Sequence, residues 1–447
     1  MASLFSISII LFVVILSFFS TTTGLISFLI VRILVPEVAR VNNSISLNTG
    51  IIFALIFVFL IKTLLLKQKI YINKRFFALI AAFLLYSVIT LPLSNYGSLS
   101  GQYEMLFQFI VTDLFPPLLF ISFISNEEQL RMIIKAYMVI AYVVCIYGIF
   151  CYFVGSNPYV SFIKDLYSST TATNGTSIAS EVWYGKATSS TFIANNQFGY
   201  YLVFTISFLA LLYHKCKDRL TSKDVSKFVI LFILLLICIV LSKKRTAVVT
   251  IVAFAIIWLV SGNIQKHLKL LIPIGGLLIV IFTVPAFSSI KNILLTSIFF
   301  WNDKYYSAVT NNNGGSNMVL RTRQVWYPFI EIKSNLLFGH GAEWCAWYTH
   351  EYTLHPILYG FETILASSIC EFGILGYVIY FFIYFFLYKF SVSNTEDRRY
   401  EKIFFITVVI GAIGTGANYW YLFLILVVFI YKLGFTEPRT LYKLRTK

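Results

Sequence analysis

The chain is organised around residues 321–376, which read RTRQVWYPFI EIKSNLLFGH GAEWCAWYTH EYTLHPILYG FETILASSIC EFGILG. Two arginines and an aromatic turn open this stretch, and it closes inside an apolar segment that carries Glu362 and Glu371. Three of the five histidines lie within it, although only 12% of all residues are charged. Polar chemistry concentrated between two apolar segments predicts a functional site.

The composition around this stretch is that of a membrane protein. Hydrophobic residues make up 58% of the 447 residues, and the mean hydropathy is +0.81. A water-soluble domain could not bury so much apolar surface, so a bilayer is the expected solvent. The formal net charge of +16 is typical of basic cytoplasmic loops and does not indicate nucleic acid as a partner.

Apolar windows near the length of a membrane span recur along the whole chain. Because a span needs about 20 apolar residues, they predict an all-α polytopic protein of about twelve transmembrane helices, with 1–447 as one membrane domain. The windows are 3–33, 49–66, 76–94, 106–124, 133–154, 192–214, 228–242, 246–260, 270–287, 362–388, 404–418 and 420–434. More than half of the 35 basic residues fall on one side, which places both termini in the cytoplasm.

This topology leaves two long external connections. The first, 155–191, is rich in Ser, Thr, Asn and Gly, and the second, 288–361, precedes the tenth helix. Apolar residues at helical spacing within 321–334 predict that the larger loop is partly helical. Its four tryptophans form either an ordinary interfacial aromatic belt or a surface that lies along the membrane.

The six cysteines predict neither a disulfide framework nor a metal site. Five of them lie in or beside apolar windows, and Cys345 stands alone in the large loop. There is no CxxC and no spacing typical of metal ligands, so no cofactor is expected.

The sequence Lys243-Lys244-Arg245 is unusual, because it separates windows 228–242 and 246–260 on the side expected to be poor in positive charge. One explanation is a solvated hairpin tip. The other is an anion site formed by Lys244 and Arg245, since a guanidinium presents a planar fork of donors that suits phosphate oxygens. A lipid diphosphate lies at that depth in the bilayer.

Arg321 and Arg323 are a second external pair of cations, beside Trp326. Arginine next to an aromatic residue can be a simple packing feature. With Arg245, the pair could also bind the same diphosphate or hold a sugar acceptor against Trp326, because fixed cations stabilise a departing diphosphate.

Glu362 is the first candidate for a catalytic base. It lies at the external mouth of a predicted span, where a carboxylate is a functional candidate by default. Glu371 falls about 13 Å deeper on the opposite helix face, which indicates a structural role. Of the loop histidines 340, 350 and 355, His355 is the second candidate base, although a loop histidine is commonly just polar surface.

Asn195 and Asn196 open the span at 192–214, immediately after the first external loop. Amides at a helix start can serve only as caps. They could equally hydrogen-bond sugar hydroxyls at the membrane face.

Several of these stretches resemble blocks of the O-antigen ligase/polymerase superfamily. Residues 191–200 are similar to its G-T-F-x-N-x-N stretch, and residues 241–247 to its S-x-S-R-T-A segment. Residues 321–326, 337–341 and 371–376 are similar to its R…W…L-F-G-x-G…E-x-G-x-x-G pattern. The blocks follow the family order.

The resemblance implies a metal-independent glycosyltransferase with a GT-C-like membrane fold. Such enzymes move glycan from undecaprenyl diphosphate outside the cytoplasmic membrane. Carried over, Arg245 and either Arg321 or Arg323 would contact the diphosphate. Ligases of the family carry an H-N-x-x-L-type motif nine residues before the E-x-G-x-x-G glutamate, where this chain has Glu362. This departure favours a Wzy-type O-antigen polymerase.

The expected activity is inverting polymerisation of lipid-linked oligosaccharides on the periplasmic face of a bacterial inner membrane. Undecaprenyl-diphosphate-linked oligosaccharides and membrane lipid are the expected partners, and a chain-length regulator is a candidate. Two alternatives stay open: an O-antigen ligase with lipid A-core as acceptor, and a flippase for the same lipids. A transporter should show charges along a path, or interrupted helices in two matching halves.

Overall fold

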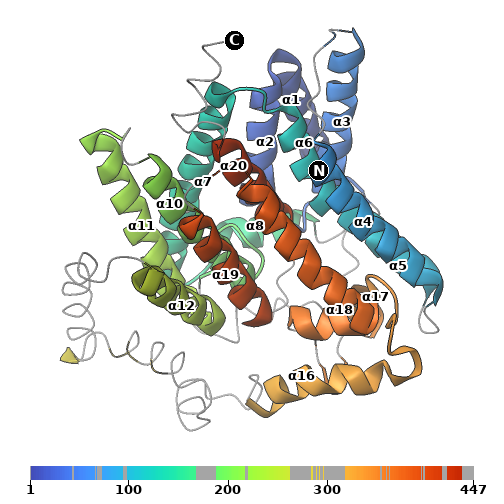
Figure 1. Ribbon diagram of the computed structural model, residues 1–447. Coiled ribbons are helices and arrows are strands. Elements are labelled where there is room, and N and C mark those ends of the chain that lie inside the picture. The colour runs from blue at the N-terminus through green and yellow to red at the C-terminus, as the bar shows by residue number, and fades with distance from the viewer. Residues whose placement is uncertain are drawn as a thin grey trace.

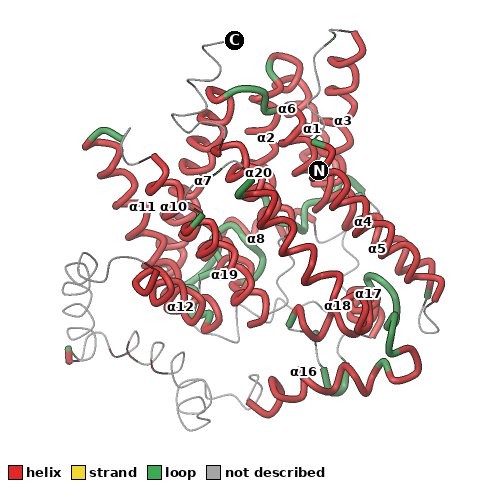
Figure 2. The backbone as a smooth tube through the Cα atoms, in the orientation of Figure 1, coloured by secondary structure: helices red, strands yellow, loops and turns green. Residues whose placement is uncertain are grey.

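The fold is a bundle of helices, seen in a computed structural model of the chain (Figure 1). The structure describes residues 2–42, 45–65, 67, 73–93, 98–167, 188–216, 220–261, 283, 284, 288, 291, 295, 318–352, 355–358, 360–361, 363–393, 395, 398–414 and 420–434. Every named element in this part of the chain is a helix, which confirms the predicted all-helical class. Figure 2 shows that most loops drawn in green are short connections between helices.

The helices account for most of the predicted apolar windows. They are α1 (Ala2–Phe19), α2 (Thr21–Leu34), α3 (Leu47–Leu65), α4 (Lys74–Thr90), α5 (Leu99–Phe109), α6 (Phe115–Phe123), α7 (Glu127–Val154), α8 (Pro158–Tyr167), α10 (Asn195–Cys216), α11 (Ser222–Leu241), α12 (Arg245–Ser261), α16 (Met318–Glu331), α17 (Trp344–Tyr352), α18 (Ile364–Ser391), α19 (Arg399–Gly414) and α20 (Trp420–Gly434). Short turns of helix are η1 (Leu91–Leu93), η2 (Ile110–Leu114) and η5 (Lys333–Asn335).

Eight helices among the described residues are long and apolar enough to cross a bilayer. They begin at Ala2, Leu47, Lys74, Leu99, Glu127, Asn195, Ser222 and Ile364. Three shorter apolar helices, Thr21–Leu34, Thr246–Ser261 and Trp420–Gly434, accompany them. The membrane class is therefore confirmed. The count of about twelve spans stays a prediction, because most of window 270–287 falls outside the described residues.

The N-terminal window 3–33, predicted as one span, is two helices. Ser20 adopts an extended conformation (φ −151°, ψ 133°) between α1 and α2. The run of three threonines after it is β-branched and competes poorly for helix, so a break there costs little. The two helices then pack closely at Gly24, where an added Cβ would lie 2.4 Å from Ser17 Oγ.

The window at 106–124 is also interrupted, by the π-helical turn η2. Phe115 N–H donates to Ile110 O, an i to i−5 bond, just before Pro116 and Pro117. Because the two prolines lack N–H groups and disfavour regular helix ahead of them, the widened turn absorbs the mismatch. It carries Asp113 into the interior of the bundle, where it is 8% exposed.

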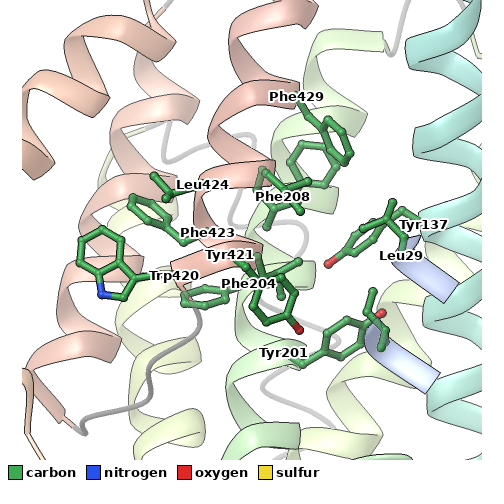
Figure 3. Close-up of a cluster of buried hydrophobic side chains, with 14 of the residues drawn as sticks. Leu29, Tyr137, Tyr201, Phe204, Phe208, Trp420, Tyr421, Phe423, Leu424 and Phe429 are labelled. Atoms are coloured by element: carbon green, nitrogen blue, oxygen red, sulfur yellow. The ribbon is translucent and has the colours of Figure 1, made fainter. Parts of the chain in front are cut away.

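The centre of the bundle is built on α10 and α20, whose side chains are buried on nearly every face. Figure 3 shows their aromatic rings meeting those of neighbouring helices, with Phe208 and Phe429 at 6.0 Å between ring centroids. A helix that is apolar and buried all round lies in the interior of a large membrane protein. The outer helices expose large apolar side chains instead, such as Phe19 and Leu64, which suits contact with lipid.

Residues 318–361 form a second, smaller packed unit, which we call the loop module. Its core is a separate apolar cluster made of Ile332, Trp344, Cys345, Trp347, Leu358 and Phe361, with Ile369 and Cys370 of α18. Figure 1 shows α16 lying across the end of the bundle, where it packs against α18, with α17 beside α18. Two contacts fix the module on α5: Trp347 lies against Gly101, and Gln102 Nε2 donates to His340 O at 3.0 Å.

Candidate functional site

Helix α18 is broken at Gly373, which has φ 64° and ψ −165°. A break in a membrane helix leaves backbone groups that must find partners within the protein. Here the loop segment 336–341 supplies them. The four bonds are Ile374 N–H to Leu336 O at 3.1 Å, Leu375 N–H to Leu337 O at 3.3 Å, His340 N–H to Cys370 O at 2.7 Å and Gly341 N–H to Glu371 O at 2.8 Å.

Two glycines make this contact possible. A Cβ added to Gly339 would lie 2.5 Å from Cys370 O, and one added to Gly373 would lie 2.4 Å from Leu337 O. Both clashes are with backbone, and both glycines have positive φ, so no other residue fits without moving the chain. The two glycine-containing stretches singled out in the sequence, 337–341 and 371–376, thus form one structural unit.

A cavity of about 220 Å³ lies beside this contact, between α4, α5, α17, α18 and the start of α20. The carboxyl groups of Glu343 and Glu371 line it, together with the hydroxyl groups of Ser87, Thr349, Ser367 and Ser368. Aromatic rings, including that of Trp420, complete the wall. No Lys, Arg or His occurs among these lining residues, so the cavity is acidic.

Glu343 and Glu371 are held differently. Glu371 Oε1 accepts a hydrogen bond from Cys345 N–H at 3.1 Å. Glu343 has φ 60°, a conformation uncommon for a residue with a side chain and typical of a constrained site. Burial, and then the charges of Glu371 and Asp113, raise the pKa of Glu343 well above its usual value. The acid pair therefore carries fewer than two charges near neutral pH.

Sequence reasoning missed Glu343 and assigned Glu371 a purely structural role. Their proximity depends on the break in α18 and on the loop contact, neither of which follows from helical periodicity. Their positions beside the glycine motifs could have indicated a shared site. Glu343 is the second residue after the G-x-G at 339–341, and Glu371 is the first residue of E-x-G-x-x-G.

Glu331, His340 and His355 form a second polar cluster in the loop module. His355 Nε2 is 3.4 Å from Glu331 Oε2, and His340 Nε2 is 3.9 Å from Glu331 Oε1. His355 Nδ1 accepts from the N–H groups of Ile357 and Leu358, so the proton of the neutral ring is on Nε2 and faces Glu331. In this arrangement His355 is placed to orient Glu331, and neither ring nitrogen is open to a substrate hydroxyl.

The environment of these groups shifts their acidity. His340 is 1% exposed, and burial lowers its pKa to about 4 in spite of the nearby Glu331 carboxylate. The His355 imidazole holds the pKa of Glu331 below its usual value. Glu331 is therefore a carboxylate, and His340 a neutral ring, at neutral pH.

The stretches at 191–199 and 241–247 also lie against each other. Thr188 N–H donates to Leu241 O at 3.2 Å, and an added Cβ on Gly199 would lie 3.3 Å from Lys244 Cβ. Asn195 is buried, and its Nδ2 donates to Ser242 O at 3.5 Å, which ties the two stretches together. Asn196 is exposed, and its Oδ1 accepts from Gln197 N–H.

The predicted cations lie at one end of the molecule. Lys244 is half-buried at the start of α12, and Arg323 is exposed on α16. Trp326 is 48% exposed on the same helix. The side chains of Arg245 and Arg321 lie outside the described part of the structure, which gives their backbone only. Figure 1 shows α12 and α16 at the same end of the bundle.

Glu362 lies outside the described residues. The chain around it belongs to the cavity wall, since Gly360, Phe361 and Ile364 line it. Thr363 then caps α18, with its hydroxyl accepting from Ala366 N–H at 3.0 Å.

A buried arginine near the 191–199 stretch was not predicted. Arg32, in the last turn of α2, lies 3.3 Å from Glu37, and its guanidinium stacks 4.1 Å above the Tyr421 ring. Gln197 Nε2 donates to Glu37 Oε2 at 3.0 Å, so this ion pair anchors the start of α10. A lone arginine in an apolar window was the signal that could have drawn attention to it.

No protein family model, curated protein or solved structure matches this chain. The resemblance to the ligase/polymerase superfamily therefore rests on the short sequence stretches alone. Function has to be inferred from the residues themselves: the loop contact at the break in α18 and the acidic cavity beside it.

Proposed function

We propose that this protein is a membrane glycosyltransferase of the O-antigen polymerase type, with about twelve spans, a GT-C-like fold and both termini in the cytoplasm. It joins undecaprenyl-diphosphate-linked repeat units on the periplasmic face of a bacterial inner membrane. The observation that supports this best is the contact between segment 336–341 and α18 at residues 370–375. It joins two distant stretches of the resemblance at the edge of a cavity.

The arrangement of charge supports two subsites with different chemistry. Among the described lining residues the cavity has two carboxyl groups and no cation, whereas Lys244 and Arg323 lie on other elements at the same end of the molecule. Such a wall suits glycan hydroxyls and offers a diphosphate no cationic partner. Arg245, Lys244 and either Arg321 or Arg323 would then hold the diphosphate, where fixed cations stabilise the charge of the leaving group.

The reaction needs one base and no metal. An acceptor hydroxyl oxygen bonds to the anomeric carbon of the donor, the bond from that carbon to the diphosphate breaks, and undecaprenyl diphosphate leaves. Glu362 accepts the hydroxyl proton as general base. Its chain neighbours line the cavity, which keeps it ahead of His355, whose two ring nitrogens are already engaged.

The break in α18 also resembles a feature of the alternative function, transport. Transporters use interrupted helices to present free backbone groups to a substrate or ion. In this chain the loop segment 336–341 takes those backbone groups at the break. The interruption therefore anchors the loop module and is not left open for transport. A ligase would use the same chemistry with a different acceptor.

A glycan ladder from a strain that lacks the gene separates these functions. Loss of the ladder with one repeat unit still on lipid A-core indicates a polymerase. Loss of every attached repeat indicates a ligase. Accumulation of lipid-linked repeats on the cytoplasmic side indicates a flippase and would contradict the proposal.

Complementation of that strain tests the cation subsite. Arg245→Ala should abolish the ladder at normal protein abundance, and Arg245→Lys should restore it only in part, because an ammonium lacks the planar fork. The control is Arg131→Ala, since Arg131 is an exposed residue that pairs with Glu127 on α7. A full ladder from Arg245→Ala would remove this residue from the site.

A further inference from the structure

The acidic cavity has no assigned occupant. The more exposed part of its wall, which we call the mouth, lies on α17 and the start of α18, where Ala346, Thr349 and Ser367 are half-buried. Phe83 and Trp420, from the bundle helices α4 and α20, are buried parts of the wall. A cavity that runs from the loop module toward the bundle interior is placed to receive a group from outside the membrane.

The chemistry of the wall does not suit an anion. Among the described lining residues there are two carboxyl groups and no Lys, Arg or His. A diphosphate placed here would lose water and gain no cationic partner, which costs several kcal/mol. The occupant is therefore neutral or cationic.

Size and ligand number argue against a metal ion. Among the described residues no group of three or more His, Cys, Asp or Glu side chains could hold one. The volume of about 220 Å³ is larger than the roughly 150 Å³ cavity that holds benzene, and it is below the size of sites for drug-like ligands, which begin near 300 Å³. It fits one six-membered ring with its substituents.

The lining matches the surface of a sugar ring. A pyranose presents several O–H donors around its edge and C–H groups on its faces. Carboxyl groups accept hydrogen bonds strongly. The hydroxyl oxygens of Ser367, Ser368 and Thr349 can accept as well, while their protons are donated to backbone carbonyls of their own helices. The aromatic residues of the wall, Trp420 among them, supply apolar surface for the C–H groups.

We infer that this cavity binds one neutral pyranose residue of the glycan, with Glu343 and Glu371 accepting hydrogen bonds from its hydroxyl groups. The choice of a sugar as ligand rests on the proposed function, and the inference deepens it by naming the glycan subsite. Burial of the carboxyl groups strengthens such bonds, because the local dielectric is low. The raised pKa of Glu343 lets the acid pair both donate to and accept from the sugar.

Protection of an engineered thiol tests the inference on the full-length protein in lipid nanodiscs, without any lipid-linked substrate. Ala346→Cys places a thiol in the half-buried mouth, and its alkylation rate by N-ethylmaleimide is measured with glucose, galactose, rhamnose or N-acetylglucosamine present. Sorbitol, an open-chain polyol, is the matched control solute. Glu351→Cys, on an exposed position of α17 outside the cavity wall, is the matched control site.

At least one pyranose should slow alkylation at position 346 about tenfold when its concentration is ten times its Kd. Sorbitol should not, and position 351 should be unaffected. Adding Glu343→Gln should weaken the protection. Thr349→Cys gives a second thiol in the mouth if Ala346→Cys does not fold.

Equal protection by sorbitol, protection by sodium chloride alone, or no protection by any of the four sugars would overturn the inference. The result is independent of polymer synthesis. If sugars protect the thiol in a protein that builds no ladder, the sugar subsite is supported and the polymerase activity is contradicted. If the ladder is normal and no sugar protects the thiol, the polymerase activity is supported and the sugar subsite is contradicted.

Discussion

At the scale of single residues, three glutamates in and beside the loop module are distinguished by their partners. Glu371 of α18 is fixed by the Cys345 amide, and Glu331 is held as a carboxylate beside two imidazoles. Burial and the Glu371 carboxyl group raise the pKa of Glu343 well above its usual value. The three glutamates are therefore suited to three different tasks.

The base is tested by a substitution that keeps shape and removes basicity. Glu362→Gln should lower polymer synthesis about 100-fold, the usual scale for a positioned general base. Glu351→Gln, on exposed surface, should leave it unchanged. Polymer is measured as ladder length normalised to protein abundance. A full ladder from Glu362→Gln, with none from His355→Ala, would transfer the role to the histidine.

The neutral ring of His340 predicts a loss of stability in acid. Its pKa is about 4 in the folded protein, against about 6.5 in the unfolded chain. Between these values the unfolded chain binds more protons, so the free energy of unfolding falls as pH falls, by about 2 kcal/mol at pH 5. Glu331 contributes in the same direction, but only below about pH 4.5, because its folded pKa is lowered.

Thermal unfolding in nanodiscs between pH 7.5 and 5 measures this effect. His340→Asn removes the titrating group and should flatten the decline, while Glu343 acts in the opposite direction because its folded pKa is raised. A decline of the same slope in His340→Asn would assign the acid sensitivity to another group.

At the scale of elements, the sequence predicted the helices that follow from composition and spacing, but it did not predict the points at which helices are interrupted. The apolar windows located α3, α7 and α10 closely, because twenty apolar residues have few alternatives to a membrane helix. The break at Ser20 and the π-helical turn at Ile110–Leu114 were not predicted. Both depend on how neighbouring helices pack, and periodicity within one helix carries no information about that.

In the candidate site, too, the features that depend on spacing were predicted and the feature that depends on a helix break was not. The glycine stretches at 337–341 and 371–376 were recognised by spacing, and the structure joins them. The cavity between Glu343 and Glu371 was not foreseen, because helical geometry alone puts Glu362 and Glu371 on opposite faces and says nothing of a loop that returns to α18. Gly373 was the residue in the sequence that could have indicated a break in α18.

The loop contact is tested by glycine substitutions that separate backbone strain from collision. Gly373→Ala and Gly339→Ala should each destabilise the protein by more than about 2 kcal/mol, because a Cβ meets fixed backbone as well as an unfavourable φ. Gly155→Ala is the matched control, since Gly155 has φ 74° but nothing within 4 Å. Its cost should stay near 1 kcal/mol. Equal thermal shifts in the three variants would show that the close approach is unimportant.

At the scale of the whole molecule, the bundle has two chemically distinct ends. The loop module, α12 and the candidate cations lie at one end, whereas the start of α11 and the end of α10 lie at the other (Figure 1). The sequence at the second end is basic, because residues 215–227 include five Lys or Arg and only two Asp. The positive-inside rule predicts that such an end faces the cytoplasm, which would place the loop module on the periplasmic side, as the proposed function requires.

This orientation is tested by cysteine labelling in intact spheroplasts. Ser334→Cys lies on the exposed surface of the loop module, and Ser222→Cys lies at the exposed start of α11. A membrane-impermeant thiol reagent should label position 334 and leave position 222 unlabelled until the membrane is permeabilised. The natural cysteines of the chain are buried or half-buried, so the unmodified protein provides the blank. Labelling of position 222 in intact cells, with position 334 protected, would invert the topology. The cavity, the cations and the base would then face a compartment in which the external donor is absent.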